Sequence, residues 1–162
     1  MNFKQGERMY TAEQIISEKK SSLICVDSES TIAEAIKMMN NNKIGAIVVK
    51  TSGKIAGIWT ERDLIKNLAE NSFDVNTAQI GDYMTKELII ASHDFSVYKL
   101  LDIFLGKRLR HLFIEKNGEI IGLLSQGDVT KASLNEKTKE LNELNKAYKW
   151  DYYETWKFNR NQ

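Results

Sequence analysis

The sequence predicts an α+β fold of two similar β-α-β-β-α units, packed sheet to sheet with pseudo-twofold symmetry and followed by a C-terminal helix. Three observations lead to this prediction. A motif recurs at a separation of 65 residues, and apolar positions keep one register around both copies. The last part of the chain has the apolar periodicity of a helix.

The repeat is clearest near the end of each unit. Gly53–Asp63 (GKIAGIWTERD) matches Gly118–Asp128 (GEIIGLLSQGD) in its glycines, its apolar positions and its last residue. The same offset carried upstream needs no gap. We therefore divide the chain into a first repeat over residues 9–72, a second repeat over residues 74–134 and a helical tail over residues 135–162.

The first elements of each repeat follow from capping and apolar patterns. Residues 11–14 (TAEQ) and 76–79 (NTAQ) have the spacing of a capping box and predict a short lead-in helix. The apolar runs Leu23–Val26 and Leu88–Ala91 have the length of short strands.

The remaining elements are predicted in the same way. Residues 31–34 (TIAE) resemble a capping box, and the apolar spacing after them is typical of an amphipathic helix. Ala46–Lys50 and Lys54–Trp59 are strands around a turn, and the second repeat carries Asn117-Gly118 at that turn, a strong hairpin signal. A last helix follows in each repeat, beginning at Thr60 in the first and at Ser125 in the second.

The third strand of the first repeat indicates how the repeats pack. Ile55, Gly57 and Trp59 alternate with other apolar residues, so both faces of the strand need cover. A unit of ~60 residues buries too little surface to be stable alone. The two sheets are therefore expected to face each other, with Trp59 and Cys25 buried.

Composition excludes several classes of protein. The 23 basic and 22 acidic residues give a net charge of +1, which argues against electrostatic binding of nucleic acid. One cysteine and two histidines supply neither an internal disulfide nor a metal site. No apolar run approaches the ~20 residues of a membrane span, and the N-terminus is no signal peptide, so we expect a cytoplasmic protein without membrane contact.

Two further absences shape the prediction. The sequence has no P-loop, no G-x-G-x-x-G and no nucleophile elbow, and its acids and histidines form no catalytic pattern, so we do not expect an enzyme. It also has no proline, so Gly, Asn, Asp or Ser must turn the loops.

Two further features of the sequence are a run of small and apolar residues at Lys43–Val49 (KIGAIVV) and a Gly-x-x-Thr/Ser-x-x-Asp motif that occurs twice, at Gly57–Asp63 and Gly122–Asp128. In these features the chain resembles a tandem pair of CBS domains, the Bateman module. The resemblance covers about residues 9–134. It implies a regulatory module, not a catalyst, that binds AMP, ADP, ATP, S-adenosylmethionine or a cyclic dinucleotide in two clefts between the repeats. The chain departs from the family pattern in having no proline near the second strand.

The resemblance places the motif Asp on the ribose hydroxyls and the Thr or Ser near ribose or phosphate. From the residues alone, Thr60/Asp63 and Ser125/Asp128 are equally typical of helix caps, and both interpretations stay open. We favour the cleft of Asp128, because a forked guanidinium and an imidazole adjoin it where the first repeat has Gly45-Ala46. By the same resemblance, the favoured cleft would comprise Ser125, Asp128, Arg110, His111, Lys19, Lys20, Ile24, Ile44 and Gly45, and the second cleft would comprise Thr60, Arg62, Asp63, Met84, Thr85, Ile89 and Leu109.

The tail is rich in aromatic residues. An apolar stripe at helical spacing runs through Leu141, Leu144, Tyr148, Tyr152 and Trp156, while Trp150 and Tyr153 lie off it. This helix either packs on its own repeats or forms a dimer contact, for which Trp and Tyr are common anchors. We favour the dimer contact.

The first hypothesis is therefore an adenine-nucleotide-sensing homodimer that signals in trans to an unknown effector protein, with no obligatory cofactor and no metal. The alternatives are a ligand-free dimerisation or interaction scaffold, and a sensor of S-adenosylmethionine or a cyclic dinucleotide.

Overall fold

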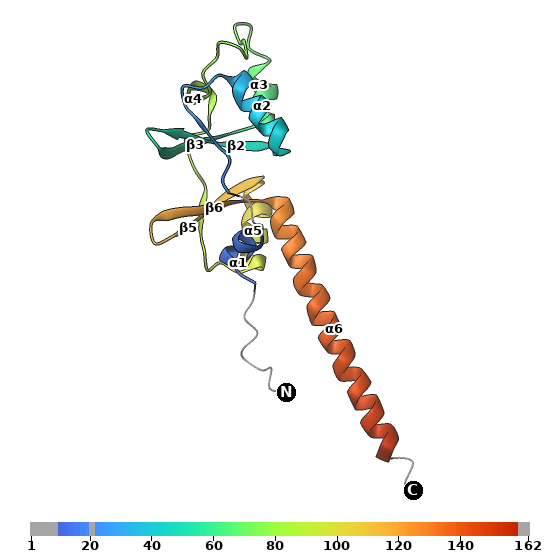
Figure 1. Ribbon diagram of the computed structural model, residues 1–162. Coiled ribbons are helices and arrows are strands. Elements are labelled where there is room, and N and C mark those ends of the chain that lie inside the picture. Colours follow the sequence, from blue (N-terminus) through green and yellow to red (C-terminus); the bar gives the residue numbers. More distant parts are fainter. Residues whose placement is uncertain (1–9, 20–21, 159–162) are drawn as a thin grey trace.

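The computed structural model describes residues 10–19 and 22–158, with side chains described as far as Lys146 (Figure 1). The first half contains α1 (Ala12–Lys19), β1 (Cys25–Asp27), α2 (Ile32–Asn42), β2 (Ala46–Thr51), β3 (Lys54–Thr60) and α3 (Glu61–Asn67). The second half contains α4 (Ile80–Tyr83), β4 (Ile90–Ser92), α5 (Val97–Lys107), β5 (His111–Lys116), β6 (Glu119–Ser125) and α6 (Gln126–Phe158).

The two halves have the same sheet topology. Each sheet has the order first–second–third strand, with a parallel pair β1–β2 or β4–β5 and an antiparallel hairpin β2–β3 or β5–β6. From β4 onward, every element begins 65 residues after its counterpart, as Ile90 does after Cys25. Even the irregularity in the middle strand recurs, between Val49/Lys50 and Ile114/Glu115. The predicted repeat is thus confirmed element by element.

The sheets face each other in the middle of the molecule, and the helices lie on the outer sides (Figure 1). Thr85, on the segment after α4, joins Ile58 of β3 through two backbone hydrogen bonds of 2.8 and 3.0 Å. The predicted sheet-to-sheet packing and the α+β class are confirmed.

The lead-in helices are exchanged between the halves, which the sequence did not predict. Ile15 of α1 packs in the core of the second half with Leu124, and Ile80 of α4 packs in the core of the first half with Trp59. Each helix therefore covers the sheet of the other repeat. Because both cores need both repeats, the pair folds as one unit.

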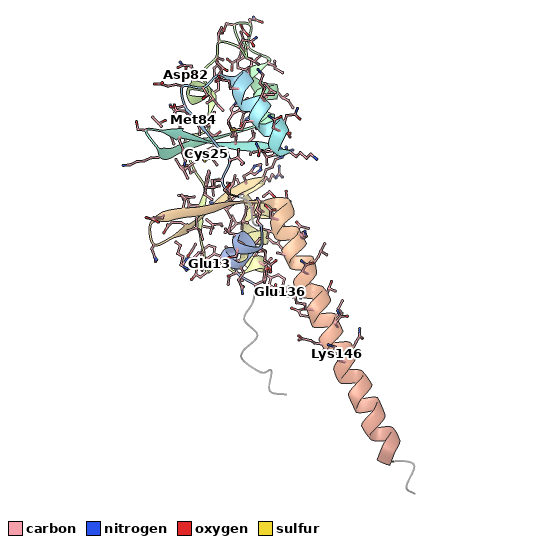
Figure 2. The ribbon with its side chains drawn as sticks, in the orientation of Figure 1. Glu13, Cys25, Asp82, Met84, Glu136 and Lys146 are labelled. Carbon is pink, nitrogen blue, oxygen red and sulfur yellow. The ribbon has the colours of Figure 1, made fainter. Side chains whose placement is uncertain are left out.

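The paired glycines of the repeated motif make room for these exchanged segments. A Cβ on Gly57 would lie 2.9 Å from the backbone oxygen of Thr85 and would overlap Met84, which lies next to β3 (Figure 2). A Cβ on Gly122 would come within 3.0 Å of Ile16 Cγ1 on α1. Glycine is needed at both positions because another chain segment approaches the strand closely.

Most predicted turns and caps are confirmed. The capping box at Thr31 is present, with Glu34 N donating to Thr31 Oγ1 at 3.2 Å. The hairpin turn has positive φ at Asn117 (53°) and Gly118 (83°), as a type I′ turn requires. Lys43 and Arg108, which end α2 and α5, are also left-handed, an unpredicted use of basic residues in a chain without proline.

The capping box predicted at residues 76–79 is wrong. The helix α4 begins at Ile80, and its N-cap Gln79 makes no side-chain capping bond. Asn76 instead lies in a turn, where its N–H donates to Asp74 Oδ1 at 2.9 Å. An Asx turn competes with helix initiation for the same backbone donors, and here it prevails.

The first strands begin two residues later than predicted, at Cys25 and Ile90. In the first half, Leu23 and Ile24 precede the strand and line a pocket between the two halves, although the carbonyl of Ile24 still accepts the N–H of Val48 on β2 at 3.1 Å. Cys25 is half-buried and not buried as expected. The short apolar run therefore serves partly as pocket wall and partly as strand.

The last helix and the tail are continuous, because α6 runs for 33 residues from Gln126. At ~1.5 Å per residue this is about 50 Å, and the helix extends well beyond the rest of the molecule (Figure 1). Leu141 and Leu144 are 59% and 57% exposed. The side chains of Tyr148, Trp150, Tyr152, Tyr153 and Trp156 lie outside the described residues. No helix within the described residues is long and apolar enough to cross a membrane.

Candidate functional site

The start of α6 holds Asp128 in a fixed position. Ser125 ends β6, and its N–H and hydroxyl donate to Asp128 Oδ2 at 2.8 and 2.7 Å. In return, Asp128 N–H donates to Ser125 Oγ at 3.2 Å. The predicted helix cap is therefore present. It aims a carboxylate and a hydroxyl at the end of the strand, where the two halves meet.

Asp128 is ionised at neutral pH. Its partial burial would raise the pKa of the carboxyl, but hydrogen bonds from Lys19 and Ser125 outweigh that effect and hold the pKa below its ordinary value. An ionised carboxylate accepts hydrogen bonds only, which suits it to two neighbouring hydroxyl groups.

Three basic residues lie at or next to this end of the strand pair. His111 begins β5 directly opposite Ser125 in the strand register. Arg110 precedes it, and its carbonyl accepts the N–H of Gln126 at 3.0 Å. Lys19 reaches the site from α1, with Nζ 2.8 Å from Asp128 Oδ2. The structure thus brings together Ser125, Asp128, Arg110, His111 and Lys19.

His111 is mainly neutral at pH 7. Burial is the largest effect that lowers its pKa below the ordinary value, and the positive charges of Lys19 and Arg110 act in the same direction. Asp128 opposes them. An approaching phosphate would add a negative charge here and favour the protonated imidazole.

An apolar pocket of about 210 Å³ lies beside these groups, between the two halves. Ile24 and Ile44 line it from the first repeat, as predicted, and Ile121 and Leu123 of β6 line it from the second. Lys19 lies at the same pocket. A largely apolar pocket of this kind, with a few polar groups at its edge, has the character of a small-molecule binding site.

Of the residues predicted for this cleft, one lies at another pocket and one is outside the described part of the chain. Gly45 faces α3, because a Cβ on it would lie 3.1 Å from Glu61 Oε2, and it lines a different pocket with Trp59 and Glu61. Lys20 lies outside the described residues. Conversely, Lys131 was missed, although it lines a pocket of about 260 Å³ with Asp128 and Lys19. Its position three residues after Asp128 on a predicted helix was the available signal.

The second cleft repeats the cap but not the basic cluster. Thr60 donates to Asp63 Oδ2 from its N–H at 3.0 Å and from its hydroxyl at 2.7 Å. Lys66 Nζ, from the same helix, is 3.7 Å from Asp63 Oδ1. Of the remaining predicted residues, Arg62 is exposed, Met84 and Thr85 lie against β3, and Ile89 and Leu109 pack on the core of the second half.

A family model for the CBS domain matches residues 13–70 and 80–135. The chain belongs to the CBS-domain family. The two matched segments correspond to the two halves of the fold, so the protein contains a CBS pair, as the repeat predicted.

Relatives and solved structures agree with this assignment. The chain is 32% identical over 123 residues to the CBS domain-containing protein CBSX3, mitochondrial, of Arabidopsis thaliana, with 73% of this chain and 60% of that protein covered. The CBS-domain protein ATU1752 of Agrobacterium tumefaciens superposes with a TM-score of 0.72 at 32% identity, over 82% of this chain and 99% of that one. The structure of CBSX2 in complex with AMP gives a TM-score of 0.63 at 20% identity, over 79% of this chain and 98% of that one.

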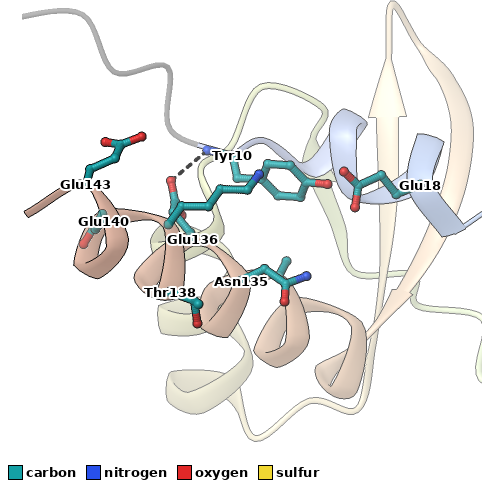
Figure 3. Close-up of a pocket in the computed structure, with 9 residues that line it drawn as sticks. Tyr10, Glu18, Asn135, Glu136, Thr138, Glu140 and Glu143 are labelled. Carbon is teal, nitrogen blue, oxygen red and sulfur yellow. Dashed lines mark hydrogen bonds between the residues drawn. The ribbon is translucent and has the colours of Figure 1, made fainter. Parts of the chain in front are cut away.

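A larger pocket of about 470 Å³ separates α6 from the N-terminal end of the CBS pair (Figure 3). Tyr10 N–H donates to Glu136 Oε1 across it at 3.0 Å. Burial and the nearby Glu18 carboxylate raise the pKa of Tyr10 to about 12. Four glutamates and one lysine line this pocket, a charge balance that repels phosphate. Within the described part of the chain, no three His, Cys, Asp or Glu side chains could hold a metal ion.

Proposed function

We propose that the chain is a regulatory CBS pair, not an enzyme, and that it binds an adenosine nucleotide (AMP, ADP or ATP) in the cleft of Asp128. The observation that carries the proposal is the placement of Asp128. A carboxylate held by its own helix cap stands between an apolar pocket and a group of basic residues. These are the three chemistries that a ribose, an adenine and a phosphate require.

The role of each residue follows from this arrangement. Asp128 accepts the ribose hydroxyls, and the pocket wall of Ile24, Ile44 and Ile121 receives the adenine. Arg110 and His111 receive the phosphate at the start of β5. The AMP complex of CBSX2 supports this choice of ligand class by similarity of fold.

Such binding would act through the relative placement of the repeats. The ligand would contact both halves, and a ligand that binds one arrangement better shifts the population toward it. The exchanged helices α1 and α4 connect each half to the other, so a shift at the cleft reaches both cores. An effector protein would read this change in trans.

Isothermal titration of the full chain with AMP, ADP, ATP and S-adenosylmethionine tests the proposal. Binding of at least one adenine nucleotide with a dissociation constant in the micromolar range is expected. S-Adenosylmethionine is the control for an adenosyl ligand without phosphate, and a cyclic dinucleotide is the control for a larger ligand. If none of the adenosyl ligands binds, the sensing function is wrong and the scaffold function described next takes its place.

A second candidate function, interaction through α6, is favoured by the exposed leucines of that helix. Leu134, Leu141 and Leu144 are 64%, 59% and 57% exposed, although leucine side chains are generally buried when a partner is available. They are consistent with a homodimer in which two copies of α6 pack along this face. The two functions are compatible, since none of these leucines lines the pockets beside Asp128 and Lys19.

A further inference from the structure

Side chains from the two repeats meet at the start of α6. Lys19 is the last residue of α1, and its Nζ lies 2.8 Å from Asp128 Oδ2 and donates to the carbonyl of Leu123 at 3.1 Å. The Lys19 and Asp128 side chains are 33% and 25% exposed. Partial burial makes this pair less screened than an ordinary surface ion pair. The first repeat thus neutralises the carboxylate that the second repeat offers to a ligand.

This contact occupies the position that a ribose needs. Oδ2 of Asp128 accepts three hydrogen bonds, from Lys19 Nζ, Ser125 N–H and Ser125 Oγ. Three donors already exceed the about two lone-pair sites of a carboxylate oxygen, so Oδ2 does not accommodate a fourth, and Lys19 is the one of the three that does not belong to the helix cap. Two neighbouring ribose hydroxyls need both oxygens of the carboxylate. Ribose binding therefore requires the ammonium of Lys19 to leave Oδ2.

The displaced ammonium would remain near other positive charges. Burial first, and then the charge of Lys19, lower the pKa of His111, so Lys19 lies within electrostatic reach of that imidazole. Arg110 adjoins His111, and Lys131 lines a pocket with Lys19. The other carboxylate that lines this pocket, Glu18, lies beside the hydroxyl of Tyr10. An ammonium that loses Asp128 in such surroundings therefore needs a new anion.

We propose that Lys19 is a specificity-determining residue, which makes this cleft select phosphate-bearing adenosine ligands against the nucleoside. A nucleotide replaces the carboxylate of Asp128 with its own phosphate as the partner of Lys19, whereas adenosine breaks the ion pair and offers nothing in return. The inference rests on the proposed function and gives the reason why the cleft prefers a nucleotide to adenosine.

The repeat supplies an internal comparison. Met84 lies 65 residues after Lys19, and it packs against Gly57 in the other half. The basic neighbour of Asp63 is Lys66, which lies on the same helix. Its Nζ is 3.7 Å from Asp63 Oδ1, and its side chain is 69% exposed. The second cleft therefore has an uncharged residue at the equivalent position. It is expected to accept adenosine and AMP more equally.

The test measures AMP and adenosine affinities by titration calorimetry on the full chain, in an Asp63→Ala background that isolates the cleft of Asp128. Lys19→Met, which introduces the residue of the other repeat, is expected to reduce the ratio of AMP to adenosine affinity by about tenfold, the scale of one charge-assisted contact. Part of that reduction in the ratio is expected to come from tighter binding of adenosine. Lys19→Arg should retain the ratio, and Lys66→Met is the matched control in which it stays unchanged.

Three results would overturn the inference. An unchanged ratio in Lys19→Met, with AMP still bound, removes the role of Lys19 and leaves the proposed function intact. A loss of AMP affinity without a gain for adenosine makes Lys19 an ordinary phosphate contact. AMP binding that disappears in the Asp63→Ala background assigns the ligand to the other cleft. By contrast, no binding by the wild-type chain refutes the proposed function itself. Circular dichroism melting checks that each variant folds, and Lys19→Gln replaces the methionine variant if it does not.

Discussion

The indole Nε1 of Trp59 donates a hydrogen bond to Oδ1 of Asn67 at 3.2 Å, and both side chains are buried. Among the residues whose side chains are described, Asn67 is the only polar one that is buried. Its counterpart 65 residues later is Ala132, and the counterpart of Trp59 is Leu124, both of them buried. One repeat thus uses a polar pair where the other uses two apolar side chains.

Asn67→Ala is expected to lower the free energy of unfolding by about 1–3 kcal/mol, because the buried indole N–H loses its acceptor. Urea denaturation measures this change. In a Trp59→Leu background the same substitution should cost clearly less, since the double variant reproduces the apolar pair of the second repeat. Equal losses in the two backgrounds would show that the hydrogen bond is not the cause.

The fold was predictable from the sequence because its signals are local and occur twice. The apolar register and the Asn117-Gly118 turn are set by neighbouring residues, and both are confirmed. The exchange of α1 and α4 was not predictable. An apolar helix face such as that around Ile15 predicts that the helix packs on a sheet. It does not indicate which of two similar sheets the helix covers.

The candidate site was predictable to a similar degree. The caps at Thr60 and Ser125 were visible as spacings, and the structure has both. Lys19 was assigned to the adenine pocket by resemblance, and the structure places it at the apolar pocket between the two halves. Its ion pair with Asp128 joins residues 109 positions apart, and no pattern within one repeat contains that contact.

Gly57→Ala is expected to destabilise the protein by roughly 1–3 kcal/mol, because the new methyl group would meet Met84 and lie 2.9 Å from the rigid backbone oxygen of Thr85. Gly106→Ala is the matched control. Gly106 lies in α5, and apart from the adjoining backbone of its own helix no atom lies within 4 Å of the place that its new methyl group would take, so alanine should add up to about 1 kcal/mol there through helix propensity. Thermal melting of both variants distinguishes the two effects, and similar shifts would contradict the steric account.

Asp128→Ala is expected to weaken nucleotide binding by about tenfold or more, the usual effect of losing a charged hydrogen-bond acceptor. Asp63→Ala should weaken it less, because the second cleft has no counterpart of Arg110 and His111 beside its cap. Calorimetric titration with AMP measures both. Equal losses, or no loss in Asp128→Ala, would refute the preference for the Asp128 cleft.

Stability should fall as the pH drops below neutrality, and His111 should cause part of this fall. Burial, together with the charges of Lys19 and Arg110, keeps the pKa of His111 below the ~6.5 of an unfolded chain. His111 therefore binds a proton more readily in the unfolded state than in the folded state. As the pH falls from about 7 through the pKa of the unfolded chain, this difference increasingly favours unfolding. His111→Gln should flatten the dependence of the urea midpoint on pH between about 7 and 5. An unaltered slope would show that other groups cause the acid sensitivity.

Removal of the outer part of α6 should weaken dimer formation. A chain that ends at Glu140 keeps the bonds of Glu136 to Tyr10 and of Glu140 to Tyr98, so the base of the helix stays attached to the repeats. It loses the exposed Leu141 and Leu144 and the aromatic residues beyond them. Sedimentation velocity is expected to show a dimer for the full chain and a larger monomer fraction for the shortened chain.

A full-length variant with Leu141→Lys and Leu144→Lys separates the leucine face from the aromatic residues that follow it. If this face forms the contact, two charges on it should weaken the dimer as much as the truncation does, because each would be buried without a partner. A dimer that survives the lysines but not the truncation places the contact beyond Leu144. A shortened chain that remains fully dimeric refutes the role of the tail, and the repeats themselves must then form the interface.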